Sequence, residues 1–260
     1  MSAIDRVKAA RAGGRPTGLD FIQNIFGDFF ELHGDRRFGD DKAVVAGLAT
    51  LNGMPVTVVA LEKGHATKDK VERNFGSAHP EGYRKALRQL KLAEKFARPV
   101  VLFVDTAGAY CGVGAEERGQ GQAIAENLME LMWLKTPVVS VLVGEGGSGG
   151  ALALAVADEV WMLQNAVYSV ISPEGCASIL WKDAAKTAEA AENLKLTAED
   201  LFKLGVVERV FPEPEGEFAP LYAELKSALF QTLHALLGGD ASQLARRRYE
   251  RFRKFGVEKA

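Results

Sequence analysis

The chain has 260 residues, of which 47% are hydrophobic and 25% charged, proportions typical of a globular protein of one large or two modest domains. A net charge of −2 gives no electrostatic reason to expect nucleic acid as a partner. Cys111 and Cys176 are too few and too far apart for a disulfide framework or a metal site. We see no signal peptide and no apolar run long enough to cross a membrane, so we expect a cytoplasmic protein.

The first hundred residues predict a helix, a hairpin and a second helix. Residues 17–33 carry apolar side chains at helical spacing after Thr17, a residue type that caps helices. Residues 43–64 predict two strands around Asn52-Gly53, the strongest short hairpin signal. Residues 81–97 predict an amphipathic helix that ends before Pro99.

The middle of the chain alternates between strand and helix. Buried strands are predicted at 99–105 and 137–143, with a helix over 116–134 between them. A glycine loop follows at 144–150, with a small-residue helix beginning near Gly149. Two short strands, EVWML and VYSVI, come next. This alternation favours a layered α/β fold.

Helical segments predominate after residue 173, and a linker at Pro212 and Pro214 precedes two C-terminal helices, roughly 218–237 and 240–255. We therefore divide the chain into a short N-terminal segment (1–16), a main domain (17–214) and C-terminal helices (215–260). The basic run RRRYERFRK in the last helix is interpreted as a solvated helix face.

The glycine-rich segment GEGGSGGALALA matches two known motifs, the G-x-G-x-x-G dinucleotide fingerprint and the G-x-S-x-G serine-hydrolase elbow. The dinucleotide fingerprint requires an acidic residue at the end of the next strand, but EVWML is followed by Gln164-Asn165. The serine-hydrolase elbow requires a histidine after Ser148, and the only one downstream is His234, on a predicted C-terminal helix. No lysine follows the glycines, so the loop is not a phosphate-binding P-loop.

Two interpretations of this loop remain open from its residues alone. Glycines between a strand and a helix leave backbone N–H groups that can stabilise an oxyanion and let a substrate approach the backbone closely. Alternatively, the glycines only permit tight packing of the strand against the helix.

The neighbouring segments point to one family. Residues 74–96, 105–128, 144–158 and 168–214 closely resemble the α-subunit family of the bacterial acetyl-CoA carboxylase carboxyltransferase. The resemblance implies a crotonase-like α/β fold, a spiral of ββα units with flanking helices, for residues 17–214. Two departures are visible beside a glycine turn: Cys111 and Ala107 stand where the family commonly has proline. Many members have a long helical extension before the first helix, and the corresponding segment of this sequence is short.

The resemblance implies transfer of a carboxyl group from carboxybiotin to acetyl-CoA, which gives malonyl-CoA for fatty acid biosynthesis. Negative charge then develops on the thioester enolate and on the ureido oxygen of biotin, and the released biotin nitrogen can take the methyl proton, so no triad is needed. By resemblance, the backbone of Gly146 and Gly147 forms one oxyanion hole, with Gly149 and Gly150 shaping the helix start. We lean towards the enolate as its ligand.

The same resemblance implies partners and cofactors. We expect a carboxyltransferase β subunit, in an α2β2 heterotetramer, to complete the active site, and a zinc ribbon only in that partner. Carboxybiotin is expected on a separate biotin carboxyl carrier protein, because this chain has no biotinylation motif, with biotin carboxylase in the wider ATP-dependent complex. No metal or covalently bound cofactor is expected in this chain.

Other residues are candidates for substrate contacts. Five basic residues can bind CoA phosphates or an acidic carrier surface: Lys63, Arg73, Arg84, Lys85 and Arg88. Ala107 and Gly108, in the DTAG segment of residues 105–108, are further candidates. Glu116 and Glu117 are either general acid–base residues or charges that stabilise a helix N-terminus. Two other functions therefore stay open: a self-sufficient crotonase-like hydratase, isomerase or decarboxylase, and a non-catalytic scaffold subunit.

Overall fold

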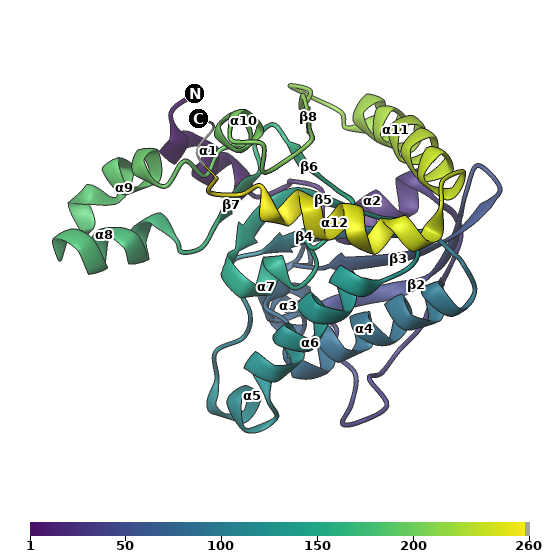
Figure 1. The fold of residues 1–260 in the computed structure, drawn as a ribbon. Helices are drawn as coiled ribbons and strands as arrows, with labels where there is room; N and C mark the ends of the chain where they lie inside the picture. The colour runs from purple at the N-terminus through teal and green to yellow at the C-terminus, as the bar shows by residue number, and fades with distance from the viewer. Residues whose placement is uncertain (258–260) are drawn as a thin grey trace.

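The structure is a computed structural model, and it describes residues 1–257. Its centre is an eight-stranded sheet with the order β1-β2-β3-β4-β5-β6-β8, and β7 pairs with the end of β5 (Figure 1). The strands are β1 (Gly27–Glu31), β2 (Val44–Leu51), β3 (Met54–Leu61), β4 (Val100–Thr106), β5 (Val138–Gly147), β6 (Glu159–Leu163), β7 (Val167–Ser169) and β8 (Arg209–Phe211).

The predicted hairpin is confirmed as β2 and β3, which pair antiparallel from Val44↔Leu61 to Leu51↔Met54. Its two-residue turn has Asn52 at φ 50° and Gly53 at φ 82°. Both residues lie in the left-handed region, which suits the right-handed twist of the flanking strands and favours an Asn-Gly sequence.

We expect Gly53→Ala to lower the free energy of unfolding by about 1 kcal/mol, because an L-residue is strained at a left-handed φ. No heavy atom lies within 4 Å of the added methyl group, so the cost comes from the backbone alone. Urea unfolding measures it. Gly216→Ala, which also meets no atom but has no left-handed φ, is the control and should change stability by less than about 0.5 kcal/mol. Equal stability of the two variants would contradict the strain argument.

From β3 onward the neighbouring strands are parallel, in the order β3, β4, β5, β6 and β8. Parallel neighbours require crossover connections, which helices supply here. The carboxyl ends of β3, β4 and β5 therefore meet at one edge of the sheet, and β7 extends this edge by pairing with Glu145–Gly147.

Helices cover both faces of the sheet (Figure 1). On one face lie α4 (Pro80–Lys95) and α6 (Gln120–Trp133), which contact each other. On the other lie α2 (Gly18–Ile25) and α11 (Ala219–Leu237). There Phe21 of α2 packs between Phe103 of β4 and Tyr222 of α11. The centroid of its ring lies 5.4 Å from that of Phe103 and 5.3 Å from that of Tyr222. The main core extends from α2 to α11, whereas the buried residues of the N-terminal segment pack in a separate, smaller cluster with Val167, Ala191 and Leu196.

The last helix, α12 (Leu244–Arg253), is fixed to the body chiefly by the fully buried Arg248. The interpretation of RRRYERFRK as a solvated face is therefore wrong in part, since Arg251 also pairs with Glu208. Arg248 donates to the Leu134 carbonyl at 2.9 Å, near the carboxyl end of α6, and to Asp158 at 2.8 Å. The free carbonyls at a helix C-terminus attract a cation, so Arg248 joins α12 to α6 and to the start of β6.

Two predicted helices are wrong in part. Residues 17–33 form α2, which ends at Ile25, and then β1, which pairs with β2 and contains Asp28 at a left-handed φ of 51°. Residues 116–134 form α5 (Val113–Glu117) and α6, separated at Gly119 with a φ of 80°. Pairing with β2 limits the first predicted helix and a left-handed glycine divides the second, and apolar spacing reveals neither.

The remaining helices complete the fold. The predicted helical segments after residue 173 are confirmed, and the N-terminal segment 1–16 also holds a helix. These elements are α1 (Ala3–Ala10), α3 (Thr67–Glu72), η1 (Asn74–Gly76), α7 (Ser148–Leu152), α8 (Pro173–Trp181), η2 (Ala184–Lys186), α9 (Thr187–Asn193), α10 (Ala198–Lys203) and η3 (Ala241–Gln243). Across residues 1–257, no helix combines the length and apolar character that crossing a bilayer requires.

Candidate active site

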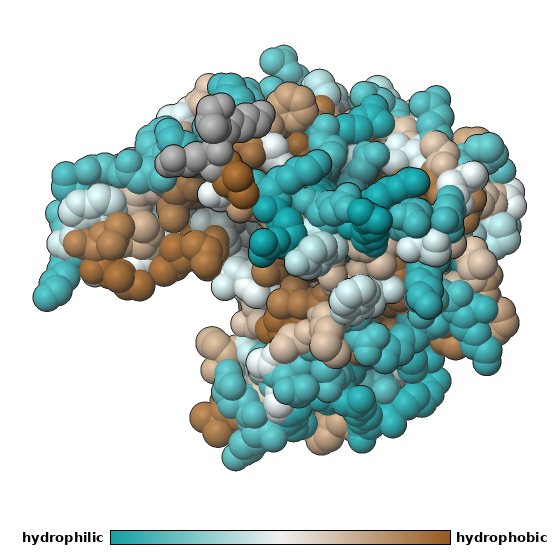
Figure 2. Space-filling view, in the orientation of Figure 1, coloured by the Kyte–Doolittle hydropathy of each residue, from teal (hydrophilic) through white to brown (hydrophobic). Residues whose placement is uncertain are grey.

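The glycine segment lies where β5 ends and α7 begins, at the carboxyl edge of the sheet. Two clefts, of about 270 and 280 Å³, border this turn and share Arg11, Ala107 and Glu145 in their walls. A neighbouring pocket of about 420 Å³ is lined by Ser148 and Gly149. The second cleft is also lined by Gly146, Gly147 and Ser148. Figure 2 shows the molecule hollowed between the protruding α8–α9 arm and the body, with hydrophobic residues on the lower side of the arm.

The predicted loop at 144–150 is mostly regular structure. Residues up to Gly147 belong to β5, and α7 begins directly at Ser148. Gly146 lies opposite Thr106 of β4 on one side and Tyr168 of β7 on the other. Because the N–H of a strand residue points towards a neighbouring strand, the Gly146 amide lies within the sheet whichever way it faces.

Close packing explains several of these glycines. A methyl group at Gly144 would overlap the Asp105 carboxylate, and one at Gly147 would overlap the Ala107 carbonyl. At Gly150 it would overlap the Ala109 backbone nitrogen. Gly149 differs, because its nearest neighbour would be Cγ2 of Ile124 at 3.7 Å, an ordinary contact. Packing therefore accounts for Gly144, Gly147 and Gly150, but not for Gly149.

The first backbone N–H groups of α7 are available to a ligand. A helix leaves the amides of its first turn without acceptors inside the helix. Within residues 1–257, no acceptor outside the helix contacts the amides of Gly149 and Gly150 either. Gly149 is half-buried and lines the neighbouring pocket together with the exposed Ser148, whereas Gly150 is buried and lines neither the clefts nor that pocket.

A buried cluster of charged residues contacts the end of β5. Lys63, Asp105 and Glu145 come from the carboxyl ends of three adjacent strands, β3, β4 and β5. The Lys63 Nζ lies 2.7 Å from Asp105 Oδ1 and 2.9 Å from Glu145 Oε1. Asp105 Oδ1 also accepts the Glu145 backbone N–H at 2.8 Å. The DTAG and GEGG segments are thus joined, and Gly144 leaves the space that Asp105 occupies.

Arg11, which follows α1, extends this cluster across the cleft. Its Nε donates to Glu145 Oε2 at 2.7 Å, and its Nη1 donates to Glu174 of α8, also at 2.7 Å. It is the only cationic side chain in the wall of the second cleft, among the residues that the structure describes. The N-terminal helix and the α8–α9 arm are both tied to the end of β5 through this residue.

Burial and charge oppose each other in this cluster. Burial raises the pKa of Asp105, and the nearby Lys63 only partly opposes this. Burial also disfavours ionised Glu145, but Lys63 and Arg11 outweigh it, so the Glu145 pKa is lowered. For Lys63, burial lowers the pKa, yet the two carboxylates more than reverse this and the net pKa is raised. Lys63 is therefore held as a cation between the two acids.

The structure gives the serine-hydrolase interpretation no support. Ser148 is exposed, with a φ of 51°, and no histidine contacts it within the described range. His33 pairs with Asp40, His65 with Asp20, and His79 with Asn74. In the same range, no three His, Cys, Asp or Glu side chains are placed to hold a metal ion.

The structure separates the predicted substrate-contact residues. Ala107 lines both clefts and Lys63 lines the first, whereas Gly108 lies beside Gly147 and Gly150. Arg73 pairs with Asp69 and donates to the Lys42 carbonyl. The three basic residues of α4 hold a different loop, residues 33–41, and line neither cleft: Arg84, Lys85 and Arg88.

Cys111, in the loop of residues 109–112, and the two glutamates that follow this loop are exposed. Glu116 and Glu117 lie on α5 and face solvent, as does Cys111. Sequence reasoning missed Asp105, Glu145 and Arg11. Glu145 stands between two glycines and Asp105 lies three residues before Gly108, each near the end of a buried strand, and this position was the available signal. Nothing local to Arg11 indicates its role, because its partners lie more than a hundred residues away.

Comparison with known sequences gives one consistent family. The family described as acetyl co-enzyme A carboxylase carboxyltransferase-like matches residues 1–256. A relative from Ruminiclostridium cellulolyticum, named acetyl-coenzyme A carboxylase carboxyl transferase subunit alpha, is 63% identical over 99% of both chains. A relative of the same name from Streptococcus pyogenes is 57% identical over 98% of this chain and 100% of its own length. One from Listeria welshimeri is 53% identical over 99% of this chain and 82% of its own.

Solved structures show the same fold at lower identity. The transcarboxylase 12S structure with methylmalonyl-coenzyme A and methylmalonic acid bound has a TM-score of 0.70 and 23% identity. It aligns with 85% of this chain, which spans 42% of that longer chain. A Pseudomonas malonate decarboxylase hetero-tetramer in complex with coenzyme A has a TM-score of 0.66 and 19% identity over 82% of this chain and 86% of that one. These likenesses confirm the crotonase-like α/β fold.

Proposed function

Because the chain belongs to the acetyl-CoA carboxylase carboxyltransferase-like family, we propose that it acts as the α subunit that helps transfer a carboxyl group from carboxybiotin to acetyl-CoA. The product, malonyl-CoA, is used for fatty acid biosynthesis. Acetyl-CoA and biotin are the substrates in this proposal, and biotin arrives on a separate carrier protein.

We place the oxyanion donors of this subunit at the start of α7. The observation that carries this proposal is the unpaired Gly149 amide, at a glycine for which packing gives no reason. The sequence-based choice of Gly146 and Gly147 is extended here by one turn, because Gly146 lies between two strands, while Gly147, which lines the second cleft, stays a candidate donor. Gly149 and Gly150 thus change from supporting residues to donors. Oriented amides stabilise developing negative charge without reorganising.

This arrangement suits a reaction that needs no protein base. Charge develops on the thioester oxygen of acetyl-CoA and on the ureido oxygen of biotin, and biotin nitrogen takes the methyl proton. The contribution of the chain is then positioning and charge stabilisation. The Lys63–Asp105–Glu145 cluster holds the end of β5, from which α7 projects. The assignment of the enolate to this subunit stays a prediction.

We propose that a β subunit covers the cleft and supplies the second set of donors. Val170, which lines the second cleft, is 76% exposed, and two hydrophobic residues of α8 are also exposed, Ile179 at 69% and Leu180 at 65%. Apolar groups exposed beside a cleft are typical of an interaction surface. The zinc ribbon and the α2β2 stoichiometry expected from the family belong to this same proposal.

The test is reconstitution. The purified chain alone should not form malonyl-CoA from acetyl-CoA and carboxybiotin, whereas the chain mixed with its β subunit should. Full activity of the isolated chain would refute the shared site. Glu116→Gln with Glu117→Gln should leave the rate of the complex within about twofold, since both side chains face solvent. Loss of activity in that variant would instead favour a hydratase-type acid–base mechanism.

A further inference from the structure

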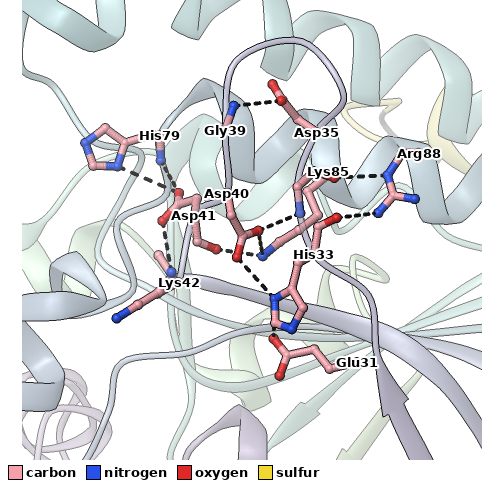
Figure 3. A network of polar contacts seen from close by, with 12 residues as sticks. Glu31, His33, Asp35, Gly39, Asp40, Asp41, Lys42, His79, Lys85 and Arg88 are labelled. Carbon is pink, nitrogen blue, oxygen red and sulfur yellow. Dashed lines mark hydrogen bonds and ion pairs between the residues drawn. The ribbon is translucent and has the colours of Figure 1, made fainter.

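The loop of residues 33–41 lies along α4 and is held there by basic side chains (Figure 3). Arg84 Nε donates to Asp35 Oδ2 at 2.8 Å, and Lys85 Nζ donates to Asp40 Oδ1 at 2.6 Å. Lys85 is fully buried, and Asp35 is buried as well. Each of these two acids therefore has a cation of its own.

Two arginines in the same region have no such partner. Arg88 donates to the Gly34 carbonyl through Nε and to the His33 carbonyl through Nη2, both at 3.0 Å (Figure 3). Arg36 Nη1 donates to the same His33 carbonyl at 2.8 Å. Within residues 1–257, neither guanidinium forms an ion pair with a carboxylate. Two positive groups thus converge on one neutral oxygen.

This arrangement is electrostatically unfavourable without an anion. Partial burial, and then the positive charge of Arg36, lower the pKa of Arg88, while Asp40 and Asp35 oppose the shift. Those two carboxylates are already engaged by Lys85 and Arg84. No carboxylate is therefore left to neutralise Arg88 and Arg36. Because like charges repel, the two guanidinium groups raise each other's energy unless an anion binds between them.

The two arginines lie in the wall of a groove of about 440 Å³. Its only acidic residues are Asp35, paired with Arg84, and Glu126, which lies 3.5 Å from Arg37. The chain as a whole has a net charge of −2, so this positive charge is local. The basic residues that line the groove are Arg36, Arg37, Arg84, Arg88, Lys91 and Lys95.

We propose that this groove binds a phosphate-bearing small molecule. Guanidinium groups match phosphate oxygens in geometry and form charge-assisted hydrogen bonds to them. The volume lies within the range of small-ligand pockets. A small anion can reach the half-buried Arg88, whereas the broad surface of an acidic protein is poorly suited to a concave site. The groove shares no residue with the two clefts at the glycine turn, so the proposal does not depend on the proposed function.

Titration calorimetry of the full chain with inorganic tripolyphosphate at low ionic strength tests the proposal. Binding should weaken as salt is added, because salt screens exposed charges. Arg36→Ala, at an exposed position, should weaken binding roughly tenfold or more. Lys95→Ala, also exposed, should weaken it by a smaller factor of about three. Arg246→Ala is the control, because this exposed arginine pairs with Glu250 on α12, outside the groove, and should leave binding unchanged.

Two sources of phosphate are distinguished by a second titration with coenzyme A, which carries a diphosphate and a 3′-phosphate. Coenzyme A binding that depends on Arg36 would identify the substrate as the source. Tripolyphosphate binding that coenzyme A does not displace would identify another phosphorylated ligand, and either result supports the groove. No binding by the unchanged chain, or equal binding by Arg36→Ala, would overturn the proposal. Displacement of tripolyphosphate by a lower concentration of an oligoglutamate peptide would overturn it in favour of an acidic protein.

Discussion

We expect Gly149→Pro to lower the rate of malonyl-CoA formation by the reconstituted complex at least roughly a hundredfold, the usual effect of removing one oxyanion donor. Proline lacks the backbone N–H that we assign to the oxyanion. Gly149 is the second residue of α7, where its N–H takes part in no helical hydrogen bond, so proline removes none from the helix. The measurement is kcat at saturating acetyl-CoA.

Gly149→Ala is the matched control, because alanine keeps the N–H. Its methyl group would lie 3.7 Å from Ile124, so the chain has room for it, and the rate should stay within about threefold. Circular dichroism and co-purification with the β subunit establish that both variants fold and assemble. If proline leaves the rate unchanged in an assembled complex, the donor lies elsewhere. If alanine abolishes the rate as well, a steric effect explains both results.

We expect Lys63→Met to lower the free energy of unfolding by about 3–5 kcal/mol near pH 7, the usual cost of removing one partner from a buried ion pair. The exposed fractions of the side chains are only 19% for Lys63, 6% for Asp105 and 11% for Glu145, so solvent compensates little for the lost cation. The two carboxylates would then face each other at the end of β5, and kcat of the complex should fall because α7 starts there.

The pH dependence of this loss has a definite sign. Glu145 has a lowered pKa, so it stabilises the folded chain above its unfolded pKa and this contribution is lost as pH falls. Lys63 has a raised pKa, so its contribution is lost only as pH rises through the folded value. Asp105 has a raised pKa and takes up its proton readily as pH falls. The Lys63→Met deficit should therefore shrink as pH falls below 7, because the two carboxylates left without their cation take up protons.

Urea unfolding at several pH values measures the Lys63→Met effect. Lys91→Met is the control, since Lys91 pairs with Glu130 on the surface and the side chains are 53% and 35% exposed. An exposed pair of this kind contributes less than about 1 kcal/mol. A loss at Lys63 no larger than that at Lys91, or one that does not change with pH, would show that the buried cluster does not stabilise the end of β5.

Local chemistry in the sequence determined much of the fold. The Asn52-Gly53 turn, the apolar strands at 100–106 and 138–143, and the amphipathic α4 follow from residue type and spacing, because short-range sterics and burial fix them. The family resemblance, carried by long motifs, indicated the fold and the carboxyltransferase class, and the relatives confirm both. The helix predicted over 17–33 failed because pairing with β2 turns Gly27–Glu31 into a strand, a non-local effect.

Only the tertiary structure decided which atoms meet at the site. Spacing cannot show that Gly146 has a strand on each side, or that a methyl group at Gly149 would make only an ordinary contact with Ile124, because both depend on how the folded chain packs. The same holds for Lys63, whose local sequence gives no sign that Asp105 and Glu145 will surround it. A sequence shows which groups are available, whereas electrostatic balance and access to a ligand depend on distances that exist only after folding.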